Sequence, residues 1–175
     1  MNEYVIGYED SKAGEDFVGR ALDVHSDTVY RLAFSHMRNE HDAKDVYQDV
    51  FLRLISKPRH FKDEEHLKAW LIRATINRCK SVHMSAWFRK TVAFDDSLSE
   101  TLTFEHKDEN DLVEYLSLLS GKYRSVIHLF YCEEMSIIEI GKIMNAKEST
   151  VRTWLTRARA ILREKLQYKG DYFNE

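Results

Sequence analysis

The chain has 175 residues, 43% of them hydrophobic and 31% charged, and a formal net charge of −3; this suits one ordinary domain or two small ones with a buried core. One proline and six glycines argue against hairpin-rich β structure and favour long, uninterrupted helices. No signal-peptide pattern opens the chain and no apolar run approaches the ~18 residues of a membrane span, so we predict a cytoplasmic protein with no membrane insertion.

The first part of the chain changes from irregular to helical. Residues 1–13 show no periodicity, and we expect them to form a loose leader. From Gly14 to about Met37, apolar residues recur at helical spacing. The pattern weakens near Ser26 and Asp27, where we expect a break in the helix.

The segment "NEHDAKDVYQDVFLRLI" predicts a second helix that ends before Pro58. Its core-facing positions are Ala43, Val46, Tyr47, Val50, Phe51 and Leu54. Asp42, Asp45 and Asp49 fall on its other face. These carboxylates fit a solvated surface, a docking face for a basic partner, or a metal site, although no histidine or glutamate from another helix is specified for a metal.

A third helix is expected from about Glu64 to Arg89, with Asp63 as its cap. Residues 66–90 carry six Lys or Arg and no Asp or Glu. Trp70 falls with the core positions, whereas Trp87 and Phe88 lie among cations. Aromatic rings that stack on unpaired bases, beside cations that hold the backbone, are how many proteins grip single strands.

The remaining sequence predicts a linker and a second helical body. Residues 91–114 carry eight acids and one lysine, and residues 147–165 are basic again, six against two. The net charge of −3 therefore includes two cationic blocks. The local positive field of these blocks attracts a polyanion more strongly than the net charge indicates. We predict an all-α fold of two small helical domains, 14–90 and 111–167, joined by a flexible acidic linker, 91–110.

The segment "SIIEIGKIMNAKESTVRTWL" has the spacing of a helix-turn-helix. Ser136 and Glu139 predict a capping box at the start of its first helix. Gly141 allows a close approach between the helices, Asn145 suits the turn, and Val151 closes the small core. In such motifs the second helix enters the DNA major groove with its N-terminal residues at base edges.

Helical periodicity separates the faces of that second helix. Val151, Leu155, Ala158 and Leu162 fall together on the apolar face. The opposite face carries Ser149, Arg152, Thr153 and Thr156, with Arg159 and Arg163 along the same flank. Arginine reads guanine with two hydrogen bonds, and hydroxyls bond bases or phosphates; the alternative is a solvated basic surface.

Together these segments resemble one family, the extracytoplasmic-function group of bacterial RNA polymerase sigma factors. "DAKDVYQDVFLRLI" looks like the region-two helix that docks on the polymerase β′ coiled coil, and "FKDEEHLKAWLIRATINRCKSV" is similar to the segment that melts and captures the minus-ten element. The sequence from "LSLLSGKYRSVIHLF" to "TRARAILREKL" resembles region four, which reads the minus-thirty-five element. The resemblance spans about residues 14–166.

The resemblance implies roles for individual residues. Those expected to face core RNA polymerase are Asp45, Gln48, Asp49 and Arg53. Those expected at the minus-ten element are Arg73, Asn77, Lys80, His83, Trp87 and Arg89. Those expected at the minus-thirty-five duplex are Glu148, Ser149, Thr150, Arg152, Thr153, Thr156 and Arg157. The implied partners are core polymerase, through its β′ coiled coil and β flap, promoter DNA, and an anti-sigma factor.

The chain departs from the family pattern at several positions. Gly121 stands where a proline is common, and Ser81 where an aspartate is common, which bears on the loop that selects the minus-ten base. Gly141 replaces a usual alanine. Ser149 replaces the usual glycine of a "GTV" run and adds a hydroxyl at the leading end of the reading helix.

The sequence leaves rival functions open. An ordinary helix-turn-helix regulator would bind duplex DNA without polymerase. In a metal protein, two pairs spaced i,i+4 would meet on one zinc ion, namely Cys79 with His83 and His128 with Cys132. These pairs lie in different predicted bodies. Isolated cysteines also favour a reducing compartment over a disulfide framework. No nucleophile–base arrangement or phosphate-binding glycine loop is present, so we predict no enzyme, cofactor or metal. We also expect the two bodies to move relative to each other in the free protein.

Overall fold

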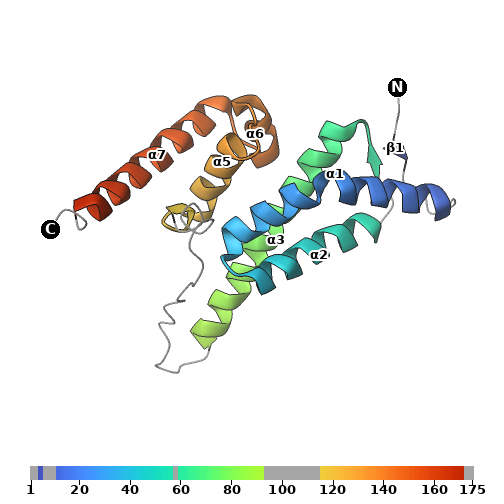
Figure 1. Cartoon of the computed structure of the whole chain (residues 1–175), viewed down its shortest axis with the longest axis horizontal. Helices are drawn as coiled ribbons and strands as arrows, with labels where there is room; N and C mark the ends of the chain where they lie inside the picture. Colours follow the sequence, from blue (N-terminus) through green and yellow to red (C-terminus); the bar gives the residue numbers. More distant parts are fainter. Residues whose placement is uncertain (1–3, 6–10, 57–58, 93–114, 172–175) are drawn as a thin grey trace.

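The computed structural model describes residues 4–5, 11–56, 59–92 and 115–171, with side chains over 17–56, 59–85 and 115–165. The elements of this part of the chain, in order, are β1 (Tyr4–Val5), α1 (Ser11–Met37), α2 (Glu40–Ile55), β2 (His60–Phe61), α3 (Glu64–Val92), α5 (Gly121–Tyr131), α6 (Ile137–Met144) and α7 (Glu148–Asp171). Figure 1 shows α1, α2 and α3 gathered in one unit and α5, α6 and α7 in another. The all-α prediction is confirmed, and the predicted linker lies outside the described residues.

The first unit is a helical bundle around an apolar core. Its fully buried side chains include Val29, Val46, Val50, Leu54, Leu67 and Leu71. Asn39 caps α2 by accepting from the Asp42 amide at 2.8 Å, and Asp63 accepts from the His66 amide at 2.7 Å at the start of α3. The predicted cap at Asp63 is therefore confirmed. Trp70 packs against this core, as expected.

The short strands β1 and β2 join residues near the start of the chain to the helical bundle of the first unit. β1 and β2 pair antiparallel, with Tyr4 opposite Phe61 and Val5 opposite His60. The expectation of a loose leader over residues 1–13 is therefore wrong at the strand, and also at Ser11, where α1 begins. Local periodicity misses such a strand because its partner lies more than 50 residues away.

The expected break near Ser26 and Asp27 is also wrong, because α1 runs continuously from Ser11 to Met37. Polar side chains at this point are satisfied by a neighbouring helix and by the loop between α5 and α6. The Ser26 hydroxyl lies 3.0 Å from the Tyr47 hydroxyl, and Thr28 donates to Glu133 at 2.9 Å. Tertiary contacts thus account for residues that look unfavourable for a helix interior in isolation.

The second unit contains the predicted helix-turn-helix. Ser136 and Glu139 form the predicted capping box at the start of α6. Asn145 takes a left-handed conformation, with φ 51°, and ends α6. Gly141 lies where the helices approach closely, because a β-carbon there would come within 2.7 Å of the Ala146 carbonyl oxygen. Val151, fully buried, closes the core as predicted.

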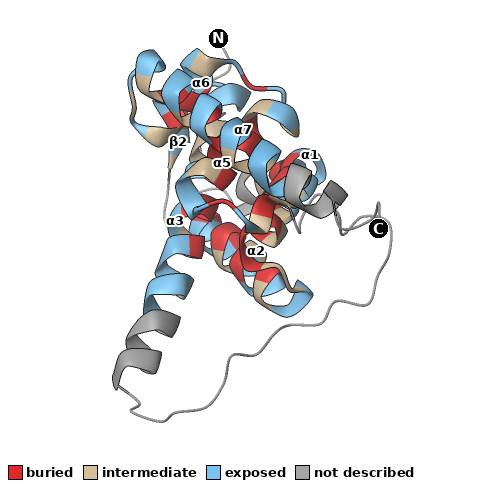
Figure 2. Ribbon diagram, turned by 90° about the vertical axis from the view of Figure 1, so that its left-hand side faces the viewer, coloured by how far each residue is buried: buried red, intermediate tan, exposed pale blue. Residues whose placement is uncertain are grey.

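The two units pack against each other, and their expected movement in the free protein stays a prediction. α5 contacts α1, and α6 contacts α3. One apolar cluster joins Leu32, Ile72 and Ile76 of the first unit to Leu116 and Val126 of the second. Figure 2 shows buried residues continuing through both units while the outer faces of the helices are exposed.

A buried arginine links the units at the end of α1. The Arg124 side chain, 7% exposed, donates to the carbonyl oxygens of His36 at 3.1 Å, Leu116 at 2.8 Å and Leu119 at 2.9 Å. Burial, and secondarily the charge of Arg38, lowers the pKa of Arg124 to about 10, so it stays protonated at neutral pH. Its donors help to satisfy these buried carbonyl oxygens, of which that of Leu116 also accepts from the Leu119 amide at 3.1 Å.

Candidate polymerase and nucleic-acid interfaces

The outer face of α2 carries the residues predicted to meet the polymerase. Asp45, Gln48 and Arg53 are exposed. Asp49 is partly exposed and forms an ion pair with Arg78 of α3. The structure therefore brings Asp45, Gln48 and Arg53 to one open face, while Asp49 is shared with the neighbouring helix.

Sequence reasoning missed apolar residues on this same face. Leu52 is 61% exposed and Ile55 is 43% exposed. They follow Asp45 and Gln48 at helical spacing, outside the core positions of α2. A helical wheel would have found them, because neither coincides with the buried stripe that ends at Leu54. Exposed apolar groups beside charged ones are typical of a docking surface.

The start of α2 also holds the candidate metal ligands. In the described part of the chain, one group of possible ligands comes together: His41, Asp42 and Asp45, whose ligand atoms lie within 4.8 Å of one another. Asp42 is already engaged, since it accepts from the Asn39 side-chain amide at 2.8 Å. The cluster is largely exposed and does not form an enclosed cation site.

The alternative zinc site is not assembled. Cys79 is fully buried in the core of the first unit, and burial raises the pKa of its thiol to about 12. Cys132 lies at the end of α5 in the second unit. Cys79, His83, His128 and Cys132 do not converge on a common point among the described residues.

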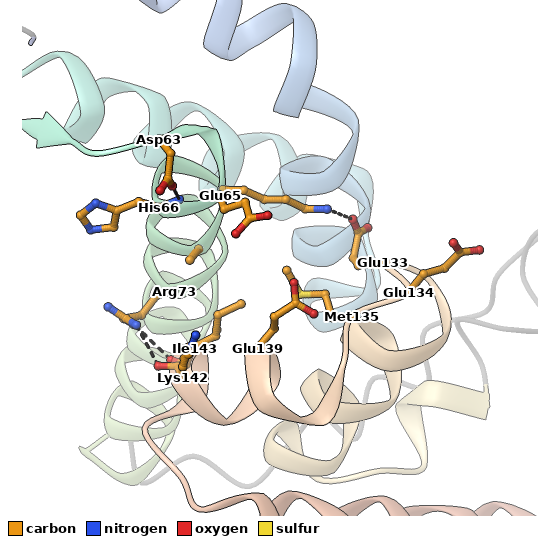
Figure 3. A pocket seen from close by; sticks show the side chains of 12 residues that line it. Asp63, Glu65, His66, Arg73, Glu133, Glu134, Met135, Glu139, Lys142 and Ile143 are labelled. Atoms are coloured by element: carbon orange, nitrogen blue, oxygen red, sulfur yellow. Dashed lines mark hydrogen bonds and ion pairs between the residues drawn. The ribbon is translucent and has the colours of Figure 1, made fainter. Parts of the chain in front are cut away.

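Among the described cations of α3, Lys68, Arg73 and Arg78 are engaged within the molecule. Arg73 donates from Nε to the Ile143 carbonyl at 3.1 Å and from Nη2 to the Lys142 carbonyl at 2.9 Å. These carbonyls belong to the last turn of α6, where a positive charge is favourable. Figure 3 shows Arg73 reaching across from α3 to this helix end.

Other predicted minus-ten residues are exposed, namely Asn77, Lys80 and His83. The His83 side chain is also hydrogen-bonded to the backbone of His36. Asn77, Lys80 and the 71% exposed Met84 follow Arg73 along one stripe of α3 at helical spacing. Met84 was not predicted, because an isolated methionine among polar residues carries no distinctive signal. The side chains of Trp87 and Arg89 lie outside the described residues.

The predicted reading face of α7 is exposed. Glu148, Ser149, Arg152, Thr153, Thr156 and Arg157 are exposed, and Thr150 is half-buried. The opposite face is buried, with Val151 and Ala158 at 0% and Leu155 at 2% exposure. The predicted separation of polar and apolar faces is therefore confirmed.

Contacts within α7 leave its reading face available. The Thr153 hydroxyl donates to the Ser149 carbonyl at 2.9 Å, and Thr156 donates to the Arg152 carbonyl at 3.0 Å. Both hydroxyl oxygens remain able to accept. Arg152 makes only a long ion pair, 3.9 Å, with Glu148 one turn earlier. Such an exposed pair is weak and can exchange for a base or a phosphate.

Arg159, expected on the same flank, is directed elsewhere. Its Nε donates to the Tyr131 hydroxyl at 2.9 Å, and its guanidinium lies 5.4 Å from the centre of the Phe130 ring. It therefore joins α7 to α5 and does not belong to the free polar face. The exposed edge of the motif is formed by the first turns of α7, ahead of this contact.

This geometry agrees with what known proteins show. The model of sigma-70 region 2 matches residues 22–90, and that of sigma-70 region 4 matches residues 109–162. The RNA polymerase sigma-E factor of Streptomyces antibioticus is 30% identical over 133 residues, which cover 72% of this chain and 71% of that protein. The chain belongs to the extracytoplasmic-function RNA polymerase sigma factors.

Further relatives extend the match over most of the sigma factor. The ECF RNA polymerase sigma factor SigW of Bacillus subtilis is 29% identical over 172 residues, covering 89% of this chain and 92% of that one. Among solved structures, the sigma factor RpoE from Bartonella quintana, in complex with the anti-sigma factor NepR, matches with a TM-score of 0.69 at 23% identity, over 87% of this chain and 98% of that one. At this identity the structural match shows the shared fold.

The functional conclusion follows from this membership. The sigma factor binds core RNA polymerase and directs promoter-specific initiation of transcription. The comparisons give no support to the alternative, a helix-turn-helix regulator that works without polymerase. Within the described residues, no helix is sufficiently long and apolar to cross a bilayer.

Proposed function

We propose that the sigma factor divides its work among α2, α3 and α7, within domains bounded at 14–90 and 111–167 and joined by the linker 91–110. α2 docks on core polymerase, α3 holds the unpaired minus-ten strand, and α7 reads the minus-thirty-five duplex. The observation that supports this division best is α7 itself. Its polar first turns are exposed while its opposite face is buried in a formed helix-turn-helix.

The proposed polymerase surface combines charge with apolar area. Asp45, Gln48 and Arg53 surround the exposed side chains of Leu52 and Ile55. Apolar area supplies affinity when it is buried against a partner, and the charges around it select the orientation. We assign this face to the β′ coiled coil and assign the β flap to the second unit. Asp49 joins the surface when its ion pair with Arg78 opens.

The proposed minus-ten surface is the stripe of α3 that begins at Arg73. Asn77 and Lys80 offer an amide and a cation to bases and phosphates, and Met84 offers a flat apolar contact for a base. His83, with Trp87 and Arg89 further along the helix, continues this surface. Sequence-tolerant stacking with charged support is how unpaired strands are held.

The proposed minus-thirty-five surface lies at the start of α7. Arg152 and Arg157 can bond guanine edges, and the Glu148 carboxylate can accept from cytosine. Ser149 and Thr153, with Thr150 and Thr156 beside them, present hydroxyls for bases or phosphates. The amides of the first helical turn also favour a phosphate.

We further propose an anti-sigma factor as a partner. Two sigma factors of the same fold have been solved in such complexes, RpoE with NepR and CnrH with the cytosolic domain of CnrY. Because core polymerase is the working partner, the cytoplasm is the proposed compartment. The sigma factor is proposed to contribute no bond-making chemistry of its own, since the polymerase catalyses RNA synthesis.

In vitro transcription with core polymerase and promoter fragments from the source genome tests these assignments. Arg152→Ala is expected to lower specific transcript about 5- to 150-fold, equivalent to about 1–3 kcal/mol for a lost bidentate base contact. Lys165→Ala removes the same charge at an exposed position of α7 beyond the reading face and should leave the yield unchanged. An equal loss in both variants would contradict the assigned reading face.

The docking face needs its own measurement. Asp45→Ala and Leu52→Ala are expected to weaken binding of core polymerase, followed by the fluorescence anisotropy of the labelled sigma factor. Asp23→Ala, at an exposed acid of α1, is the matched control. If Asp23→Ala weakens binding as much as Asp45→Ala does, the assignment of α2 is wrong.

A further inference from the structure

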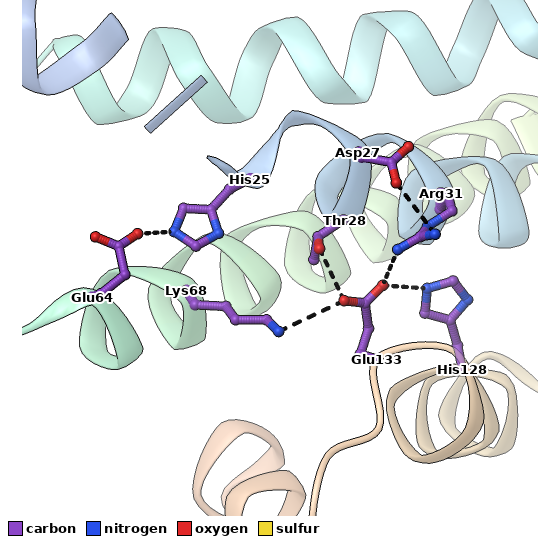
Figure 4. A network of polar contacts seen from close by, with 8 residues as sticks. All are labelled: His25, Asp27, Thr28, Arg31, Glu64, Lys68, His128 and Glu133. Carbon is purple, nitrogen blue, oxygen red and sulfur yellow. Dashed lines mark hydrogen bonds and ion pairs between the residues drawn. The ribbon is translucent and has the colours of Figure 1, made fainter. Parts of the chain in front are cut away.

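A single buried carboxylate joins the two units. Glu133 lies in the loop between α5 and α6, and its side chain is 3% exposed. It accepts from Thr28 at 2.9 Å and from Arg31 at 3.3 Å, both on α1. Lys68 of α3 lies 3.8 Å from it, and His128 of α5 lies 3.6 Å from it. Figure 4 shows these side chains converging on Glu133 from three helices.

The charge of Glu133 is well compensated in this position. Burial alone would raise the pKa of its carboxyl, but the contacts of His128 and Thr28 and the charge of Arg31 outweigh burial and lower the pKa. The group is therefore ionised at neutral pH. While the units are packed, this carboxylate is out of water and depends on its partners, so reversing its charge opposes the packing of the second unit on the first.

A second contact involves the proposed minus-ten surface directly. Arg73, the first residue of the α3 stripe, is held by the last carbonyls of α6, those of Lys142 and Ile143. A strand that follows the stripe toward Arg73 meets α6 at this point (Figure 3). The side of α6 that contacts α3 also buries Ile143. Closure of the units therefore occupies Nε and Nη2 of Arg73, although the side chain stays exposed.

The other proposed surfaces stay open in this arrangement. Asp45 and Leu52 of α2 are exposed, and so are Arg152 and Arg157 of α7. Core polymerase can thus reach α2 while the units are closed. At the beginning of the α3 stripe, the hydrogen-bond donors of Arg73 are already engaged by α6.

We infer that the α5–α6 loop is an intramolecular latch, in which Glu133 seats the second unit on α1 and α3 and keeps Arg73 from single-stranded DNA until the units separate. This inference rests on the proposed minus-ten role of α3. It adds that the free chain has a closed state, in which α6 and an unpaired DNA strand compete for Arg73.

The test replaces the carboxylate by a cation in the full-length chain. Glu133→Lys places a positive charge among Arg31, Lys68 and His128. Glu134→Lys makes the same charge change at the adjacent, exposed residue and is the matched control. Circular dichroism checks that both variants keep their helix content; if Glu133→Lys does not fold, Glu133→Gln removes the charge while keeping the size of the side chain.

Small-angle scattering and binding of a labelled mixed-sequence single-stranded oligonucleotide are the readouts. Wild type and Glu134→Lys are expected to be compact, and Glu133→Lys expanded. We take the open state to be about 10% of the molecules in the wild type. Full opening in Glu133→Lys should then tighten DNA binding about tenfold relative to Glu134→Lys. Adding Arg73→Ala to Glu133→Lys should remove most of this gain.

Defined results overturn the latch. They are an expanded wild type, an unchanged radius of gyration in Glu133→Lys, or an expansion without tighter DNA binding than in Glu134→Lys. Transcription by Asn77→Ala tests the minus-ten role of α3 separately, because Asn77 takes no part in closure. Scattering reports closure even if α3 binds no DNA, so failure of the latch and failure of the proposed surface give different results.

Discussion

The helices proposed to touch DNA, α3 and α7, are both rich in cations but hold them differently. On α7, Arg152 and Arg157 are exposed, and Arg152 has only a long contact to Glu148. On α3, Arg73 is bonded to α6 and Arg78 is paired with Asp49. Basic residues on a helix are available to DNA only when they are not hydrogen-bonded or ion-paired to another part of the same chain.

This difference follows from what each helix must recognise. A duplex presents its groove without prior change, so a reading face can be complete in the free protein. An unpaired strand exists only after melting, so a surface for it gains nothing from being open earlier. The following predictions test how far α3 and α7 differ, starting with the largest effect.

The exposed face of α7 depends on its buried face. Val151→Asp places a carboxylate at a fully buried position and should cost more than about 4 kcal/mol. We expect thermal unfolding, followed by circular dichroism, to show loss of the second unit. Arg152→Asp, one residue along, should keep the melting temperature of the wild type while abolishing promoter-specific transcription. Equal melting temperatures for both variants would contradict the assigned faces.

The contact between α1 and α5 at His36 should weaken in acid. His36 is buried, bonds Ser125 at 3.1 Å, and has a pKa lowered to about 3 by burial and then by Arg124, with His128, His83 and Lys80 adding to the effect. The unfolded chain takes up this proton near the ordinary pKa of about 6.5 and the folded chain does not, so stability falls as the pH falls below that value.

The size of the acid effect can be measured by urea unfolding at several pH values. Between pH 6.5 and pH 5 the loss from His36 should be about 2 kcal/mol, at about 1.4 kcal/mol per pH unit. His36→Gln should flatten this slope, whereas His60→Gln, at an exposed histidine of β2, should keep it. A slope that is unchanged in His36→Gln would show that other groups control the acid response.

Removing one arginine from each helix compares them directly. Arg73→Ala loses hydrogen bonds to α6 carbonyls and should lower the free energy of unfolding by about 1 kcal/mol. Arg152→Ala should change it by less than about 0.5 kcal/mol, as is usual for an exposed residue. Urea denaturation at neutral pH measures both. Equal costs would remove the distinction between engaged and available cations.

The smallest effect concerns the turn that positions α7. Alanine normally favours a helix over glycine by about 1 kcal/mol. At Gly141, however, the new methyl group would meet the Ala146 carbonyl at 2.7 Å, so we expect Gly141→Ala to destabilise by about 1 kcal/mol. Gly19→Ala in α1, where no atom lies within 4 Å, should stabilise instead. A stabilising Gly141→Ala, measured by thermal unfolding, would show that the turn adjusts freely.

Features set by neighbours in the sequence could be predicted. The Ser136–Glu139 capping box, the turn at Asn145 and the buried stripe through Val151 each depend on residues within a few positions of one another. The family resemblance added the order of the domains. The proposed site residues on α7 were therefore placed before the fold was known.

Features set by distant segments could not be predicted. The partners of Arg73 lie about 70 residues further on, and the partners of Glu133 on α1 lie more than 100 residues earlier. Leu52 is a different case, since helical spacing from the core positions of α2 already separates it from the buried stripe. Periodicity shows which face of a helix is apolar but does not identify what covers that face.

The buried Arg124 has a consequence for how this protein is made and dissected. It takes the His36 carbonyl as an acceptor, 88 residues earlier in the chain, and Leu32 completes the apolar cluster around Val126. The carboxyl-terminal half therefore completes its core only against the first unit. In a fragment that begins at residue 111, we expect the guanidinium of Arg124 and these apolar side chains to be open to solvent and to self-association.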